Sequence, residues 1–275
     1  MDSDRPSRPT EAWTDGTAYE PFMGRWSRLA AQAFLQWLNI PPANRWLDVG
    51  CGTGVLSQTI LQSSAPVRIQ GVDRSASYLP FARGAVIDDR VAFAIGDAQA
   101  LPVGDASFDV VVSGLMLNFV PRPQQALEEM ARTVRPQGVV ALYVWDYAAK
   151  MQPLRHFWNA AAALDPGAFP LDEGRRFPLC NPQTLTELFQ AARLEAVEVR
   201  AIDVATDFRD FDDYWLPFLR GATPASSYVT SLPEPHRTDL RERLRAALPA
   251  ALDGSIPLVA RAWAVRGRRQ AEHLT

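Results

Sequence analysis

Three glycines separated by single residues follow a short apolar run in the segment Leu47-Asp-Val-Gly-Cys-Gly-Thr-Gly54. Glycine permits positive φ and has no Cβ atom, so these glycines let a ligand lie directly against the backbone. The dinucleotide pattern G-x-G-x-x-G needs its third glycine one residue later, and no Gly-Lys-Ser/Thr follows to form a phosphate loop. The segment therefore indicates a nucleotide-like ligand, and a tight strand-to-helix turn in another α/β fold is the alternative.

Two aspartates follow later apolar runs, in Gly71-Val-Asp73 and Gly96-Asp97-Ala98. Asp73 stands 73 − 50 = 23 residues after the first glycine, close to the roughly 20 expected for a carboxylate that binds a ribose hydroxyl pair. Asp97 is placed to accept a hydrogen bond from an adenine amine. Each aspartate alone is typical of a solvated strand end, but three such features at successive strand ends favour a single ligand site.

These residues need a sheet whose strands end at one edge. From residue 44 to 145, short apolar runs alternate with stretches of helical spacing, which predicts a mostly parallel, doubly wound α/β sheet. The expected strands are 45–49, 67–72, 91–95, 108–113, 138–145, 196–204 and 256–265. The expected helices are 53–62, 75–84, 123–134 and 182–193.

The chain divides into three expected parts. Residues 1–44 are expected to form an N-terminal helical lid. Residues 45–206 and 254–267 are expected to form a Rossmann-like core. Five prolines and several charged helical pieces interrupt the alternation at 207–253, which predicts a helical cap inserted between the last two strands.

The composition excludes several classes of protein. The chain has 275 residues, is 47% hydrophobic and has a formal charge of −3, so it can bury a core and offers no basic surface for nucleic acid. Two cysteines and three histidines are too few for a disulfide framework or a zinc site, so no metal is expected. No apolar run approaches the ~18 residues of a membrane span, so a cytoplasmic protein is expected.

Five segments in order resemble one family, the class I S-adenosylmethionine-dependent methyltransferases: Asp48–Gly54, Gly71–Asp73, Gly96–Ala98, Leu101–Asp109 and Leu127–Gly138. The resemblance covers residues 45 to 146 and is strongest to the small-molecule branch that includes the ubiquinone and menaquinone C-methyltransferases. It implies a seven-stranded sheet whose last strand is antiparallel. It also implies in-line methyl transfer from S-adenosylmethionine to O, N or C of a small organic molecule, with S-adenosylhomocysteine as product.

The resemblance also implies roles for single residues. Asp48 would lie near the amino group of the cofactor, Asp73 would bind the ribose, and Asp97 would meet the adenine, while Cys51 would be a loop residue and no nucleophile. The whole implied cofactor site is Asp48, Gly50, Cys51, Gly52, Gly54, Asp73, Arg74, Ser75, Gly96, Asp97, Ala98, Ser113 and Leu115. Tyr19, Met23 and Trp26 are expected to close over the cofactor, and ordinary helix packing is the alternative.

The sequence contains fewer features that indicate the methyl acceptor than features that indicate the cofactor. Aromatic residues at helical spacing in 208–218 indicate either a wall for an apolar or aromatic acceptor or the core of the cap. His156 is the one candidate base, with a packed histidine as the alternative. The rival functions are a cofactor-binding regulatory protein without activity and an NAD-dependent oxidoreductase. The acceptor, the methylated atom and the oligomeric state stay open.

Overall fold

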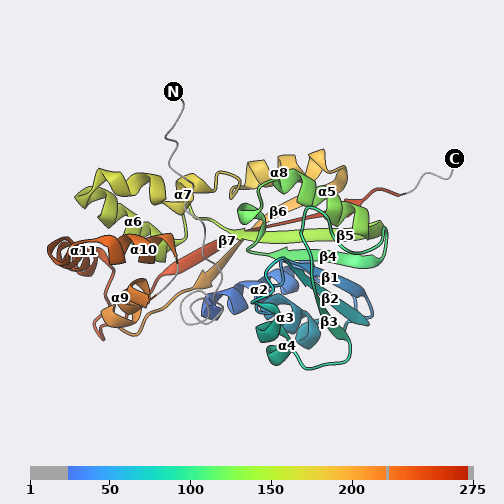
Figure 1. Ribbon diagram of the computed structural model, residues 1–275, viewed down its shortest axis with the longest axis horizontal. Coiled ribbons are helices and arrows are strands. Elements are labelled where there is room, and N and C mark those ends of the chain that lie inside the picture. The colour runs from blue at the N-terminus through green and yellow to red at the C-terminus, as the bar shows by residue number, and fades with distance from the viewer. Residues whose placement is uncertain (1–23, 221–222, 272–275) are drawn as a thin grey trace.

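The computed structural model describes residues 24–220 and 223–271, which form a seven-stranded sheet with helices on both faces (Figure 1). The strand order is β3-β2-β1-β4-β5-β7-β6. The first five strands pair in parallel, and β7 runs antiparallel to both of its neighbours. The strands are β1 (Arg45–Val49), β2 (Arg68–Asp73), β3 (Val91–Ile95), β4 (Phe108–Gly114), β5 (Val134–Trp145), β6 (Leu194–Ala205) and β7 (Val259–Arg269). The predicted fold, with its antiparallel last strand, is confirmed.

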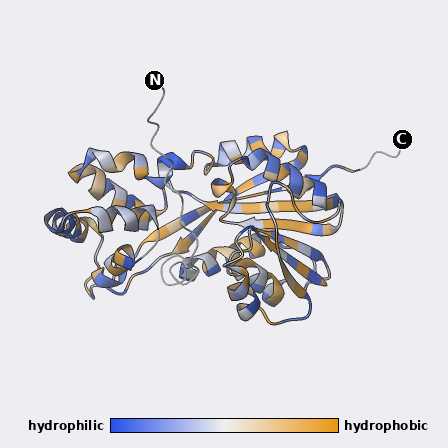
Figure 2. Cartoon of the chain, in the orientation of Figure 1, coloured by the Kyte–Doolittle hydropathy of each residue, from blue (hydrophilic) through white to orange (hydrophobic). Residues whose placement is uncertain are grey.

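Burial explains the central strands, and pairing explains the additional residues at the ends of β5 and β7. Strands β1, β4 and β5 are covered on both faces, which suits their nearly continuous apolar runs (Figure 2). Strand β5 begins four residues earlier than predicted and β7 ends four residues later. Those extra residues are mostly polar and gain their strand conformation from neighbouring strands, as when Arg269 of β7 pairs with Leu194 of β6.

Helices from both halves of the chain cover the sheet. Helices α2, α3 and α4 pack on one face, and α5 and α8 pack together on the other (Figure 1). Their bounds are α2 (Arg25–Leu38), α3 (Val55–Ser63), α4 (Leu79–Ala85), α5 (Pro123–Thr133) and α8 (Pro182–Ala191). Helix α3 begins later than predicted because Gly54, at φ +89°, is not helical. No helix among the described residues is long and apolar enough to cross a membrane.

A group of helices lies beyond the carboxyl ends of β5 and β6, at one end of the molecule (Figure 1). Residues from the predicted cap form α9 (Phe211–Arg220), α10 (Pro224–Ser231) and α11 (Glu234–Ala247). An unpredicted segment after β5 packs against them and consists of α6 (Gln152–Leu164), the 3-10 helix η3 (Pro166–Leu171) and α7 (Glu173–Arg176). From here on, the word cap means all six of these helices and not only the predicted insertion at 207–253.

Aromatic rings form the interior of the cap. The rings of Phe157 in α6 and Phe218 in α9 stack at 4.6 Å, and Trp158 meets Phe157 edge-on at 4.9 Å. The buried residues of α6 recur at helical spacing, so the sequence carried a signal for this helix that the strand–helix alternation obscured.

Candidate functional site

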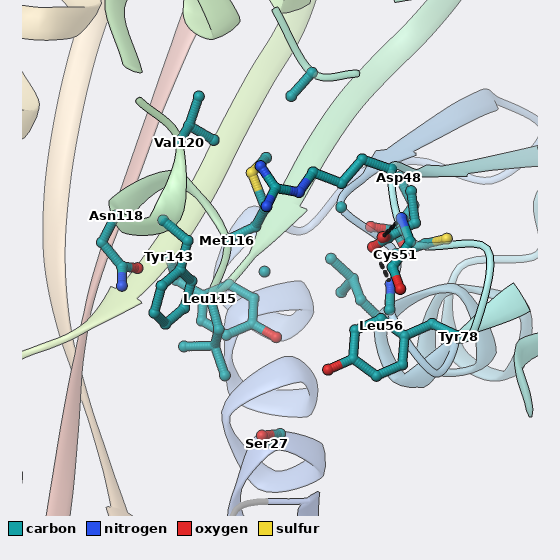
Figure 3. Close-up of a pocket in the computed structure, with 18 of the residues that line it drawn as sticks. Ser27, Asp48, Cys51, Leu56, Tyr78, Leu115, Met116, Asn118, Val120 and Tyr143 are labelled. Atoms are coloured by element: carbon teal, nitrogen blue, oxygen red, sulfur yellow. Dashed lines mark hydrogen bonds between the residues drawn. The ribbon is translucent and has the colours of Figure 1, made fainter. Parts of the chain in front are cut away.

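A cavity of about 940 Å³ lies at the carboxyl ends of β1 to β5, and Arg176 of α7 forms part of its wall (Figure 3). This size lies near the top of the ~300–1,000 Å³ range of small-molecule sites. Its wall is formed by Ser27, Asp48, Gly50, Cys51, Gly52, Thr53, Val55, Leu56, Asp73, Arg74, Ser75, Tyr78, Gly96, Asp97, Ala98, Gln99, Gly114, Leu115, Met116, Asn118, Phe119, Val120, Pro121, Tyr143, Trp145, Tyr147, Arg176 and Phe177.

The wall has two ends of different chemistry. The glycine-loop end comprises the residues that follow β1, β2 and β3, from 48–56, 73–78 and 96–99. The aromatic end comprises Asn118, Phe119, Tyr143, Trp145, Tyr147, Arg176 and Phe177. In Figure 3, Asn118 and Tyr143 lie across the cavity from Asp48 and Cys51.

The backbone of the glycine loop is shaped as the sequence predicted. Gly50, Gly52 and Gly54 all have positive φ, at +72°, +51° and +89°. The Gly50 and Cys51 N–H groups donate to the carbonyl of Val72 at 2.8 and 3.1 Å, which ties the loop to β2. A Cβ atom on Gly52 would meet nothing within 4 Å, so this position borders open space that a ligand can fill.

Asp48 is a fully buried carboxyl group with one oxygen unsatisfied. Its Oδ2 accepts a hydrogen bond from the Ser57 hydroxyl at 2.7 Å, and its Oδ1 has no partner. Burial raises the pKa of Asp48 to about 7; the Ser57 hydrogen bond opposes this rise and the nearby Asp73 carboxylate adds to it. An unsatisfied buried carboxyl oxygen costs on the order of 1–3 kcal/mol, so this atom suits a ligand that carries a hydrogen-bond donor or a positive charge.

Asp73 is held in place by two backbone donors. The N–H of Gly52 donates to Oδ2 and that of Ser75 to Oδ1, each at 2.8 Å. A carboxylate has about four lone-pair sites, so acceptor sites on both oxygens remain for a ligand. The carboxylate therefore both orders the glycine loop and lines the cavity.

Asp97 is more exposed than these two carboxyl groups. It accepts hydrogen bonds from the Gln99 backbone N–H at 2.8 Å and from the Gln99 amide. The backbone bond is the main reason that the pKa of Asp97 lies below its usual value. Arg74, Gly96 and Ala98 line the same end of the cavity.

Four of the predicted residues that the structure describes do not appear in this wall. Gly54 faces α4 instead, since a Cβ there would meet Ala82 at 3.2 Å. Ser113 is buried within β4 and its hydroxyl has no partner, while Gly114 and Leu115 reach the cavity. Trp26 packs edge-on against Phe208 at 5.1 Å, which matches the packing alternative. Tyr19 and Met23 lie outside the described residues, and His156 is treated next.

His156 is a half-buried residue of α6 that does not line the cavity. Burial lowers the pKa of its imidazole. Cys51 does line the cavity, but burial raises the pKa of its thiol well above the usual value, so it is not a thiolate nucleophile. The described wall thus contains neither a histidine base nor an activated cysteine.

The aromatic end was not predicted. Its residues come from three separate segments, after β4, at the end of β5 and at the end of α7. Phe177 joins them, since its ring lies 5.1 Å from that of Phe119 and 5.4 Å from that of Tyr147. The expectation that ligands bind beyond the carboxyl ends of strands at a switch in strand order could have indicated the first two segments. The short helix α7 has no comparable signal.

The aromatic residues of 208–218, by contrast, are buried inside the cap. Phe211, Tyr214 and Phe218 pack against one another or against Phe157, and none of them lines the cavity. Their structural role is the alternative given above, the core of the cap.

Comparisons with known proteins agree with this geometry. Residues 47–142 match the family model for a methyltransferase domain. The chain is 30% identical to a demethylmenaquinone methyltransferase from Roseiflexus castenholzii, over 59% of this chain and 72% of that protein. It belongs to the class I S-adenosylmethionine-dependent methyltransferases.

Two further comparisons set the limits of this family assignment. The chain is 31% identical to the methyltransferase GfsG of Streptomyces halstedii, over 47% of this chain and 48% of that protein. In this and two further curated relatives, the matched region covers about half of the length of the relative or slightly less. Phosphoethanolamine N-methyltransferase 2 of Haemonchus contortus, solved with S-adenosyl-L-methionine, shares the fold with a TM-score of 0.57 at 17% identity, over 93% of the present chain and 56% of that chain.

Proposed function

We propose that this protein transfers a methyl group from S-adenosylmethionine to an O, N or C atom of a small organic molecule. The observation that carries the proposal is one continuous cavity in which the glycine loop and the aspartates form one end and aromatic side chains form the other. Such a cavity can hold a nucleoside cofactor and a small acceptor together.

The glycine-loop end fits the cofactor. The unsatisfied Oδ1 of Asp48 supplies an acceptor for an ammonium group, and the open space over Gly52 admits a ligand against the backbone. Asp73 keeps acceptor sites for a ribose hydroxyl pair, and Asp97 lies at the end of β3 for the adenine. S-adenosylmethionine supplies a methyl group on a positively charged sulfur, which an acceptor displaces in line.

The residues of the chain position the cofactor and the acceptor and exclude water from the site of transfer. Asp73 holds the glycine loop through Gly52, so the loop and the ribose site form together. Trp145 and Phe177 are buried side chains of the cavity wall that exclude water from the acceptor. Because proximity and exclusion of water supply much of the rate in such a transfer, a dedicated base is not required.

One binding measurement and one methyl-transfer assay test the proposal. Isothermal titration is expected to show S-adenosylhomocysteine binding and no NADH binding, and the reverse result would refute the proposal in favour of the oxidoreductase. Incubation of cell extracts with the protein and methyl-labelled cofactor is expected to yield a labelled small molecule. Cofactor binding with no labelled product from any extract would favour the regulatory protein.

A further inference from the structure

Asn118 is a buried polar residue at the aromatic end that the cofactor site does not use. It lies in the 3-10 helix η2 (Leu117–Phe119), directly after β4, and lines the cavity. Its side chain is 8% exposed, and neither its amide oxygen nor its amide nitrogen has a hydrogen-bond partner. Buried side-chain amides usually form hydrogen bonds, so the NH₂ donor and the oxygen acceptor of Asn118 are both available to a ligand in the cavity.

The chemistry of an amide limits what that partner can be. A ligand group that satisfies Asn118 must both accept from its NH₂ and donate to its oxygen. Hydroxyl and carboxamide groups can do both, whereas an ether or a ketone can only accept.

The surroundings of Asn118 favour a flat ring. The ring of Phe177 meets that of Phe119 edge-on at 5.1 Å and that of Tyr147 at a tilt at 5.4 Å, and Tyr143 and Trp145 also line this end. Aromatic rings prefer such offset and edge-on neighbours, so an aromatic ligand can extend the cluster.

The carboxylates of the described wall all lie at its glycine-loop end, where Arg74 lies as well. Asp48, Asp73 and Asp97 all belong to the glycine-loop end, and Arg176 is the charged residue that the described aromatic end contains. Among the described residues, the aromatic end offers a cationic acceptor a guanidinium and no carboxylate, so these charges favour a neutral or anionic molecule.

We propose that the aromatic end binds a flat aromatic acceptor, neutral or anionic, whose hydroxyl or carboxamide group hydrogen-bonds to Asn118. Calling this ligand the acceptor rests on the proposed methyl transfer, but the binding site does not. Asn118 is then a residue that selects the acceptor and does not take part in cofactor binding.

A probe series on the unmodified protein tests the ligand class. With S-adenosylhomocysteine bound, 2-naphthol is expected to bind at least tenfold more tightly than 2-methoxynaphthalene, decahydro-2-naphthol or cationic 2-naphthylmethylamine. The readouts are isothermal titration and quenching of tryptophan fluorescence, since Trp145 lines the cavity. Equal binding of naphthol and its methyl ether, or preferred binding of the amine, would overturn the inference. Failure of S-adenosylhomocysteine itself to bind would instead refute the proposed function.

The variant Asn118→Leu separates recognition from structure. Removing two unpaired buried polar atoms is expected to raise Tm, while 2-naphthol binding falls at least tenfold and S-adenosylhomocysteine binding stays within twofold. Asn159→Leu, at an exposed position of α6, is the matched control and is expected to leave both affinities unchanged. Unchanged naphthol binding in Asn118→Leu would contradict the assignment. If that variant does not fold, the probe series decides alone.

Discussion

The two ends of the cavity are built in different ways. The glycine-loop end is local: each contributing segment follows its own strand, and backbone N–H groups bonded to Asp73 and Val72 set its shape. The aromatic end is assembled from three segments in different parts of the fold, 118–119 after β4, 143–147 at the end of β5 and 176–177 at the end of α7, and the last of these comes from the cap. The first end therefore depends on backbone conformation, and the second depends on how the cap packs on the sheet.

The largest expected effect removes a ring from the cap. Phe157→Ala is expected to lower the free energy of unfolding by about 3–5 kcal/mol, because a fully buried aromatic side chain is lost. Urea unfolding measures the loss, and hydrogen exchange is expected to increase more in the cap than in β1 to β3. Phe169→Ala, at a side chain 46% exposed, is the control and is expected to cost far less. Equal increases in exchange throughout the sheet would show that the two regions unfold together.

The next effect concerns the glycine-loop end alone. Asp73→Ala is expected to weaken S-adenosylhomocysteine binding by about 1.5–3 kcal/mol, roughly 10- to 150-fold, because a charged hydrogen-bond acceptor is lost. Isothermal titration measures this change, with the exposed Asp89→Ala as control. Unchanged affinity would refute the ribose role of Asp73.

A pair of glycine substitutions compares backbone strain with steric contact. Gly50→Ala and Gly52→Ala both place alanine at positive φ, which costs about 1–2 kcal/mol in each. Only at Gly50 would the new Cβ also overlap the Cβ and Cγ atoms of Met116, so Gly50→Ala is expected to lower Tm further. A double-mutant cycle with Met116→Gly is expected to recover that difference, and additive effects would contradict the steric explanation.

The last effect is a pH dependence that both regions share. Burial raises the pKa of Asp48 to about 7 and that of Glu173, in the cap, also to about 7. The folded protein then holds protons that the unfolded chain releases, so stability is expected to fall as pH rises from about 5 to 7 and to level off above that. Thermal unfolding across this range measures the slope, which Asp48→Asn and Glu173→Gln are each expected to reduce.

The pH dependence of S-adenosylhomocysteine binding, measured by thermal unfolding with and without the ligand, distinguishes the two carboxyl groups. If Asp48 receives the ammonium group of the cofactor, saturating S-adenosylhomocysteine favours its ionised form, so the ligand is expected to bind more tightly at pH 7 than at pH 5. Asp48→Asn should lose this dependence, and Glu173→Gln should keep it. A dependence that persists in Asp48→Asn would place the titrating group elsewhere.

The sequence predicted the sheet and the glycine-loop end because both depend on short-range patterns. Gly50 and Asp73 are recognisable from residue type and spacing alone. Ser113 shows the limit of this reasoning, because it is buried and does not line the cavity, whereas Gly114 and Leu115, which follow it, do.

The aromatic end could not be predicted in the same way. Phe177 and Tyr147 have residue types that are common in any core, and only the packing of the cap brings them to the cavity. The rings of 208–218 have the same composition and a more regular spacing, yet they are buried within the cap. Residue type alone does not distinguish a lining ring from a packing ring.

The position of β7 between β5 and β6 has a consequence for biosynthesis. Within the described sheet β6 pairs with β7 alone, and 258 − 205 = 53 residues separate its end from the start of β7. At a ribosomal rate of ~5–20 residues per second, the nascent chain displays two unpaired strand edges for roughly 3–10 s. During that interval the edges of β5 and β6 can pair with other chains, so slow translation of 206–258 is expected to promote aggregation.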